Sequence, residues 1–432
     1  MSRYSSLNRK ELIDEYKTEK KRYDALKEQN YVIDMSRGKP GADQLALSSA
    51  IFKTVNDELG YLSVEGTDCR NYGILGGIYE CKKMFADMLD VKPENVIVGG
   101  NSSLSLMYDY IAQCMLDGVS GCTPWCKLPE VKFLCPAPGY DRHFGICEHF
   151  GIKMISIPML WDGPDIAALE SYMDDPSVKG MFCVPKYSNP QGITFSDEIV
   201  RRIAALKPAS KDFRIIWDNA YCVHDITDKP DVLLNIFSVL PEYSNDDMVV
   251  EFASTSKISF PGAGVSAITA SERNIREILK RLSAQIICYD KINQLFHARY
   301  FKSNEDIARH MKLHAEIIRP KFETVLNTLE DEIGDKGIAQ WNSPNGGYFI
   351  SLDVLSGSAA RVGALCRECG LTITKVGATF PYGKDPNDRN IRIAPTFPSV
   401  KELETAALIL CISVKIACLE SLLMPKKEGS IS

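Results

Sequence analysis

The sequence of 432 residues lacks any segment that would direct it to a membrane or out of the cell. Its first residues, MSRYSS, do not contain the apolar core of a signal peptide. The most apolar late run, residues 406–414, is nine residues long, whereas about twenty apolar residues are needed to cross a bilayer. We therefore predict a cytoplasmic protein with no membrane partner.

Metal-binding patterns are incomplete. Cys366 and Cys369 form a CxxC pair, but no second CxxC or HxxH pair completes a tetrahedral zinc site. His310 and His314 lie four residues apart on an expected helix, yet the glutamate of an HExxH motif is missing, so we interpret both as surface residues of that helix. The 14 cysteines are expected to be reduced thiols. No metal is predicted.

A basic surface is absent as well. The net charge is −6, with Lys and Arg interspersed among Asp and Glu, which argues against a nucleic-acid partner. No GxGxxG follows a strand and opens a helix, which disfavours a nicotinamide-dependent dehydrogenase. The segment before Tyr31 reads as one charged helix, so the DNA-binding domain of a transcription regulator is not expected. Small molecules are the predicted partners.

What the sequence does contain is an alternation of short apolar runs with helix-length segments. Seven runs recur from residue 96 onward: ENVIVGG, KFLCPAP, KMISIPM, GMFCVP, RIIWDNA, MVVEFAST and GVSAITA. Continuous Val, Ile and Phe are typical of strands buried on both faces, so we predict an α/β fold with a mostly parallel, seven-stranded sheet. We place this large domain at residues 49–305 and a smaller α+β domain at 306–432, which the N-terminal segment 1–48 joins.

Polar and aromatic side chains follow most of these runs, at the sheet edge where ligands of α/β proteins bind. They are Asn101, Ser102 and Ser103 after the first run, Tyr140 and His143 after the second, Asn189 after the fourth, Asp218 and Tyr221 after the fifth, and Ser254, Ser256 and Lys257 after the sixth. The first three residues open a helix and would cradle an anion, although Asn and Ser are also ordinary N-cap residues.

Lys257 is the residue around which this set is organised. Most lysines are solvated surface residues, and in isolation Asp218 would be a helix N-cap and Tyr221 a core aromatic. Taken together and in order, they favour a site for pyridoxal phosphate. That cofactor needs an amine for its aldehyde, a carboxylate for its ring nitrogen, donors for its phenolate and an anion site for its phosphate.

Three motifs in this order resemble the fold-type I pyridoxal-phosphate aminotransferases: NPxG at Asn189, D-x-x-Y from Asp218 to Tyr221, and S-x-S-K ending at Lys257. The late segment NIRIAPTF supplies Arg392, where that family keeps its substrate-carboxylate arginine. The resemblance covers about residues 31–398. More narrowly, SRGKP, NYGILGG and STSKISFPGAG resemble the class Ic (MocR-like) branch of aspartate aminotransferases.

The resemblance implies a role for each residue. Lys257 would bind the cofactor covalently and then move the Cα proton, while Asp218, supported by His143, would lie against the ring nitrogen. The remaining cofactor contacts implied are Asn189 and Tyr221 at the ring oxygen, Tyr140 on the ring face, and Asn101, Ser102, Ser103, Ser254 and Ser256 at the phosphate. Tyr72 is implied to reach the phosphate of a neighbouring subunit, which predicts a homodimer with shared active sites.

The substrate follows from the same resemblance. Arg392 would hold the α-carboxylate through two parallel hydrogen bonds. A distal carboxylate would need a second cation, and the candidates are Arg37 and Lys39, which flank Gly38, together with Arg142 and Lys291. L-Aspartate with 2-oxoglutarate as acceptor, in a ping-pong reaction, is favoured. A different amino-acid specificity, or a lyase or decarboxylase on the same scaffold, stays open.

One departure from the family concerns the phosphate. Many members carry an arginine a few residues beyond the lysine, whereas KISFPGAGVSAI offers only small and apolar residues there. Arg70 is the candidate substitute.

Overall fold

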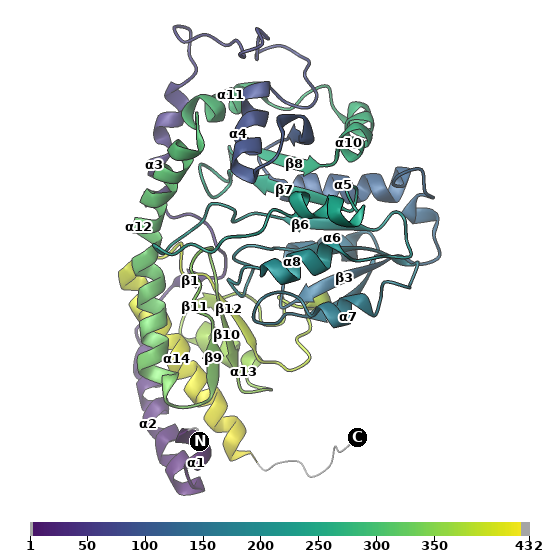
Figure 1. Cartoon of the computed structure of the whole chain (residues 1–432). Helices are drawn as coiled ribbons and strands as arrows, with labels where there is room; N and C mark the ends of the chain where they lie inside the picture. The colour runs from purple at the N-terminus through teal and green to yellow at the C-terminus, as the bar shows by residue number, and fades with distance from the viewer. Residues whose placement is uncertain (1–2, 425–432) are drawn as a thin grey trace.

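The computed structural model describes residues 3–424 (Figure 1). Its centre is a seven-stranded sheet with the order β2-β8-β7-β6-β5-β3-β4. The strands are β2 (Val96–Val98), β3 (Lys132–Ala137), β4 (Lys153–Pro158), β5 (Val178–Cys183), β6 (Arg214–Asp218), β7 (Val249–Ser254) and β8 (Ser266–Ala270). All neighbours are parallel except β8, which runs antiparallel to both β7 and β2. The predicted seven-stranded, mostly parallel sheet is confirmed.

Helices cover both faces of this sheet because successive strand residues point to opposite sides. Ile216 packs in a cluster with α5 (Ser103–Asp117), α6 (Asp141–His149) and α10 (Glu272–Gln285). Its neighbour Ile215 packs with α7 (Ile166–Glu170), α8 (Asp197–Ala204) and α9 (Ile236–Val239). At the end of the sheet formed by β2 and β8, α4 (Tyr79–Leu89) and α11 (Lys291–Tyr300) pack against these two strands. Six of the seven strands are therefore buried on both faces, as their continuous apolar runs predict. The edge strand β4 differs, because Lys153, Ser156 and Pro158 are exposed.

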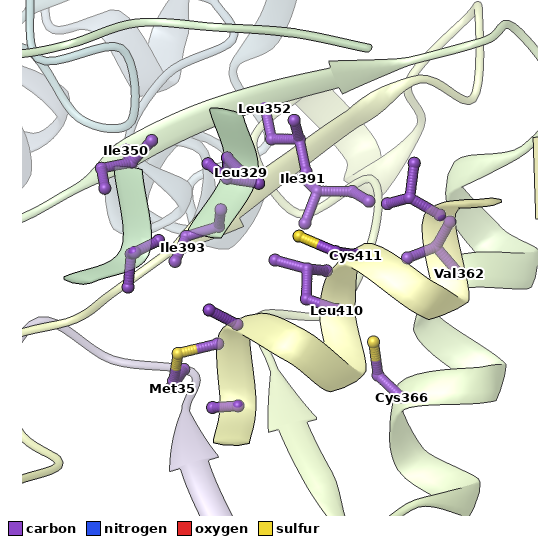
Figure 2. Close-up of a cluster of buried hydrophobic side chains, with 14 of the residues drawn as sticks. Met35, Leu329, Ile350, Leu352, Val362, Cys366, Ile391, Ile393, Leu410 and Cys411 are labelled. Atoms are coloured by element: carbon purple, nitrogen blue, oxygen red, sulfur yellow. The ribbon is translucent and has the colours of Figure 1, made fainter. Parts of the chain in front are cut away.

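A second, smaller α+β region lies below this sheet in Figure 1. It contains the antiparallel sheet of β12 (Asn390–Ile393), β10 (Ile350–Val354) and β9 (Ala339–Trp341), and the parallel pair of β1 (Ile33–Met35) and β11 (Leu371–Ile373). Its helices are α2 (Arg9–Lys27), α12 (Asn304–Leu329), α13 (Ala359–Glu368) and α14 (Val400–Leu423). Figure 2 shows Leu352 and Ile391 of the sheet packed toward Leu410 of α14. Because β1 pairs with β11, the N-terminal segment contributes to this region. The two predicted domain boundaries, after residues 48 and 305, stay predictions.

Short helical segments complete the chain. They are α1 (Arg3–Ser6), α3 (Ala42–Leu47), the 3-10 turns Ser49–Lys53, Pro93–Asn95, Trp125–Lys127, Leu240–Tyr243 and Pro381–Gly383, and a π-helical turn at Glu330–Gly334.

The apolar part of α14 is longer than the nine-residue run, residues 406–414, that was identified in the sequence. Within residues 3–424 it is the one helix long and apolar enough to cross a membrane, with a mean hydropathy of 2.1 over its most apolar window. However, 72% of that window is buried inside the protein, where α14 packs against α2, α12 and α13. This is the environment of a core helix.

The prediction for the two histidines on α12 is wrong. His310 and His314 are buried rather than on the helix surface. His310 Nε2 donates to the carbonyl of Ile258 at 2.8 Å, and His314 Nδ1 lies 3.2 Å from Gln44 Nε2. Burial lowers the pKa of both rings, that of His314 to about 4, so both are neutral near pH 7. His310 thus connects α12 to the backbone immediately after Lys257, and His314 connects it to Gln44.

Candidate active site

A cleft of about 310 Å³ lies at the carboxyl ends of the parallel strands, where it also meets the smaller region. Residues after β2, β3, β5, β6 and β7 line one side of it, and residues from β12 and from the loops next to β1 and β10 line the other. Of the residues predicted from sequence, the lining contains Arg37, Gly38, Lys39, Ser102, Ser103, Tyr140, Arg142, Asn189, Asp218, Tyr221, Ser254, Ser256, Lys257 and Arg392. Residues up to 355 positions apart in the chain thus meet at one place.

Lys257 projects into the cleft directly after β7. Its Nζ lies 4.9 Å from the centre of the Tyr221 ring and 5.9 Å from that of Tyr348. Burial lowers the pKa of Lys257, and the nearby Asp218 carboxylate opposes part of that shift. A lowered pKa increases the fraction of neutral amine, which is the nucleophilic and basic form. The amine is therefore suited to covalent binding and to proton transfer.

Asp218 ends β6 and is buried. Its Oδ2 lies 2.9 Å from His143 Nε2, as the resemblance implies. Its Oδ1 is buried too, and no residue in the described part of the chain donates a hydrogen bond to it. Leaving a buried polar atom unpaired costs about 1–3 kcal/mol, so this oxygen is suited to accept from a donor that residues 3–424 do not supply. The N–H of a protonated pyridine ring is such a donor.

An anion cradle lies at the start of α5. Ser102 is the N-cap, but its hydroxyl makes no capping hydrogen bond within residues 3–424. It therefore stays available, together with the first backbone N–H groups of the helix. Ser254 and Ser256 face the same cleft, with their hydroxyl oxygens 3.1 Å apart. These groups can bind a phosphate without a cation.

Asn101 does not belong to this cradle as predicted. It is exposed and absent from the described lining of the cleft, and its Nδ2 donates to the carbonyl of Pro261 at 3.1 Å. Its own carbonyl accepts a hydrogen bond from Ser256 Oγ at 3.0 Å. Asn101 thus positions Ser256.

Arg392 on β12 is buried and held on three sides. Its Nε donates to Thr374 Oγ1 at 3.1 Å, and its Nη1 donates to Asn189 Oδ1 at 3.1 Å and to Asp141 Oδ1 at 2.9 Å. Nη2 has no hydrogen-bond partner among the residues described. The guanidinium lies 4.9 Å from the centre of the Phe349 ring. This arrangement presents a fixed cation to the cleft.

Asp141 and Phe349 are residues of the site that the sequence analysis missed. Asp141 directly follows Tyr140 after β3, so its place near a strand end was the available signal. Phe349 accounts for the presence of glycine at position 38, because a Cβ on Gly38 would lie only 2.7 Å from Phe349 Cζ. Gly38 therefore allows the two loops to approach closely.

The two tyrosines of the cleft remain protonated. Burial raises the pKa of Tyr140 to about 12, and burial also raises that of Tyr221 far above its usual value. Both phenols are therefore hydrogen-bond donors near pH 7.

Three of the four candidate cations for a second carboxylate line the cleft, namely Arg37, Lys39 and Arg142. Lys39 Nζ lies 3.9 Å from Asp34 Oδ2 and 3.8 Å from the centre of the Phe397 ring. Lys291 is the exception: it is 2% exposed, its Nζ donates to Cys288 Sγ at 3.2 Å, and it is outside the described lining of the cleft. We therefore remove Lys291 from the candidates.

Tyr72 and Arg70 lie away from their own cleft. Tyr72 is 77% exposed, and the Arg70 guanidinium is paired with Asp68 at 2.7 Å. Neither is in the described lining. Their predicted roles at a phosphate therefore require a neighbouring subunit.

The groups that line the cleft fit pyridoxal phosphate. Lys257 offers the amine, Asp218 Oδ1 the unpaired carboxylate oxygen, Tyr140 and Tyr221 the aromatic and donor groups, and the start of α5 the anion cradle. These are the four requirements of the cofactor.

Comparisons with known proteins find similarity over most of the chain. The profile of the aspartate amino-transferase family matches residues 7–426. A putative aminotransferase from Mycolicibacterium smegmatis is 43% identical over 426 residues, covering 98% of this chain and 100% of that protein. An aspartate aminotransferase from Corynebacterium glutamicum is 41% identical over 402 residues, 93% of each protein. The crystal structure of an aspartate transaminase from C. glutamicum matches with a TM-score of 0.95 at 40% identity, covering 98% of this chain and 99% of that one.

Proposed function

Since the chain belongs to the aspartate amino-transferase family, we propose that it moves the amino group of L-aspartate to 2-oxoglutarate in two half-reactions at one site. The chain is a pyridoxal-phosphate-dependent aminotransferase that acts on an amino acid and a 2-oxo acid. One observation carries the proposal: Lys257, the unpaired oxygen of Asp218 and the guanidinium of Arg392 face a single cleft. The cleft thereby combines an amine that can react, a carboxylate that can bind the ring nitrogen of the cofactor, and a guanidinium that can bind the carboxylate of the substrate.

The cofactor, when bound, accepts the amino group and delocalises the electrons left at the substrate Cα. The chain supplies the rest. The neutral amine of Lys257 takes the Cα proton, helped by its lowered pKa. Asp218, held by His143, presents a negative oxygen that keeps the ring nitrogen protonated. Because Asn189 Oδ1 accepts from Arg392, the amide NH₂ is left to donate to the ring oxygen together with Tyr221.

Arg392 orients the substrate. Thr374 and Asn189 fix its guanidinium plane, so a carboxylate can bind in one orientation only. Because Lys257 lines the same cleft, we propose that the carboxylate bound in this way directs Cα toward the Lys257 amine. Arg37, Lys39 and Arg142 line the same cleft and can neutralise a second carboxylate, which supports a dicarboxylic amino acid as substrate.

Initial rates test this proposal. With the cofactor-loaded protein, L-aspartate and 2-oxoglutarate should give oxaloacetate and glutamate in equal amounts, and double-reciprocal plots at several fixed 2-oxoglutarate concentrations should be parallel. L-Alanine in place of L-aspartate is the matched comparison and should react far more slowly. Intersecting lines would exclude the ping-pong order. Carbon dioxide or ammonia as the product would indicate a decarboxylase or lyase.

We also propose a cytoplasmic homodimer whose active sites are shared. The support is the exposure of Tyr72, together with the exposed apolar side chains of Leu62 and Val64 in the same segment. In the dimer, Tyr72 of each subunit would reach the phosphate site of the other, and Arg70 would be near the same site.

Subunit mixing tests the shared site. Tyr72→Ala and Lys257→Ala should each be strongly impaired alone, but a hybrid dimer contains one site with both native residues. After complete random exchange of equal amounts, roughly a quarter of the wild-type activity should return, since half of the dimers are hybrids with one intact site of two. Mixing Lys257→Ala with Asp218→Asn is the control and should restore nothing, because both residues serve their own subunit. Absence of recovery despite demonstrated exchange would contradict the shared site.

A further inference from the structure

The guanidinium proposed to bind the substrate carboxylate is already paired with a carboxylate of the chain. Asp141 Oδ1 accepts from Arg392 Nη1 at 2.9 Å. Asp141 is the first residue of α6 and lines the cleft, and its side chain is 34% exposed against 6% for Arg392. The acid therefore lies on the open side of the buried cation.

A substrate carboxylate must share this arginine. Two parallel hydrogen bonds need two N–H groups on one edge of the guanidinium. Nε is used by Thr374, and Nη1 is used by Asn189 and Asp141. Nη2 alone has no partner among the described residues, so two-point binding requires that the incoming carboxylate replace one of these three acceptors. Thr374 and Asn189 are buried, whereas Asp141 is partly exposed to the cleft, so Asp141 is the acceptor that an incoming carboxylate meets first.

Building on the proposed function, we propose that Asp141 is a specificity-determining residue that competes with the substrate carboxylate for Arg392. In the free protein, Asp141 neutralises a buried cation that would otherwise be unpaired. In the complex, its displaced charge lies near that of the ligand and weakens binding. Asp141 thus lowers the affinity of a cleft that three further cations line: Arg37, Lys39 and Arg142.

If Asp141 had only a structural role, its replacement would affect the stability of α6 and not the binding of a carboxylate to Arg392. An acid in the first turn of a helix stabilises that helix through the helix dipole. Asp197 has the same position in α8, where it is exposed. Asp197→Asn is therefore a matched control that loses the same interaction with a helix N-terminus but none with Arg392.

The test is calorimetric titration of succinate, an unreactive dicarboxylate, into the purified full-length protein, with and without added cofactor. Asp141→Asn keeps the shape of the side chain and removes its charge, and it should bind succinate about tenfold more tightly than the wild type. Asp197→Asn should bind as the wild type does, and Asp141→Glu should restore weaker binding. In steady-state assays, the effect of Asp141→Asn should fall on the KM for L-aspartate rather than on kcat.

Unchanged or weaker succinate binding by Asp141→Asn would overturn the inference and leave Asp141 as a support for Arg392. Arg392→Leu distinguishes this outcome from failure of the proposed function. If Arg392→Leu abolishes succinate binding while Asp141→Asn has no effect, only the role of Asp141 fails. If Arg392→Leu binds succinate normally, the cleft does not recognise carboxylates through Arg392, and the proposed substrate mode fails with it.

Discussion

Replacing Lys257 by alanine removes transamination almost completely while the fold is retained. The amine is expected to bind the cofactor and to move the Cα proton, and loss of a positioned acid–base group alone costs about 10²–10⁴ in rate. We therefore expect kcat to fall by at least about a thousandfold. The side chain ends in an open cleft, so the thermal unfolding midpoint should change little. The measurements are the steady-state rate, the unfolding curve and the visible absorbance of the purified protein.

Lys39→Ala is the matched comparison, because Lys39 is a second lysine of the same cleft. That variant should keep the visible absorbance of a covalently bound cofactor, whereas Lys257→Ala should lose it. Substantial turnover by Lys257→Ala would show that Lys257 is not the lysine that binds the cofactor covalently. Loss of the absorbance in Lys39→Ala, with the absorbance kept in Lys257→Ala, would assign that role to Lys39.

Asp218→Asn should lower kcat by about 10²–10³, the typical cost of removing one preorganised electrostatic group from an active site. The amide can still bond to His143, so the side chain keeps its place. The change removes the negative charge at Oδ1, the atom that no described residue satisfies. Without that charge the ring nitrogen is no longer kept protonated, and the Cα proton becomes harder to remove.

Asp218→Ala provides the comparison within the same position. It also leaves His143 without its partner in a buried place, so it should lose stability as well as activity, unlike the isosteric amide. A kcat for Asp218→Asn within a few fold of the wild type would exclude Asp218 as the partner of the ring nitrogen.

The large sheet was predictable because its pattern is local. Strands that are buried on both faces have continuous apolar sequences. The residues that follow each such run lie at the carboxyl edge of the sheet, where ligands bind. Lys257, Asp218, Tyr221 and Asn189 could be chosen on this basis, and all four line the cleft. The same logic extended one residue too far at Asn101, whose side chain turns to Pro261.

Other features depend on contacts between distant segments, which one sequence does not reveal. His310 and His314 were predicted to lie on the helix surface because the glutamate of an HExxH motif is missing, but both are buried and contact Ile258 and Gln44. The pairing of Asp141 with Arg392 joins positions 251 residues apart. Lys291 was a reasonable cation by type, yet α11 directs it into the protein. In each case tertiary packing overrides what the local sequence indicates.

The most direct test of the account is the absorbance spectrum of the cofactor-loaded protein before and after addition of L-aspartate without any 2-oxo acid, with oxaloacetate assayed in the same sample. The account predicts that the visible band of the lysine-bound cofactor disappears and that one oxaloacetate forms per active site, after which 2-oxoglutarate restores the band. A protein that binds no cofactor through Lys257, or a band that L-aspartate leaves unchanged while no oxaloacetate forms, would contradict it.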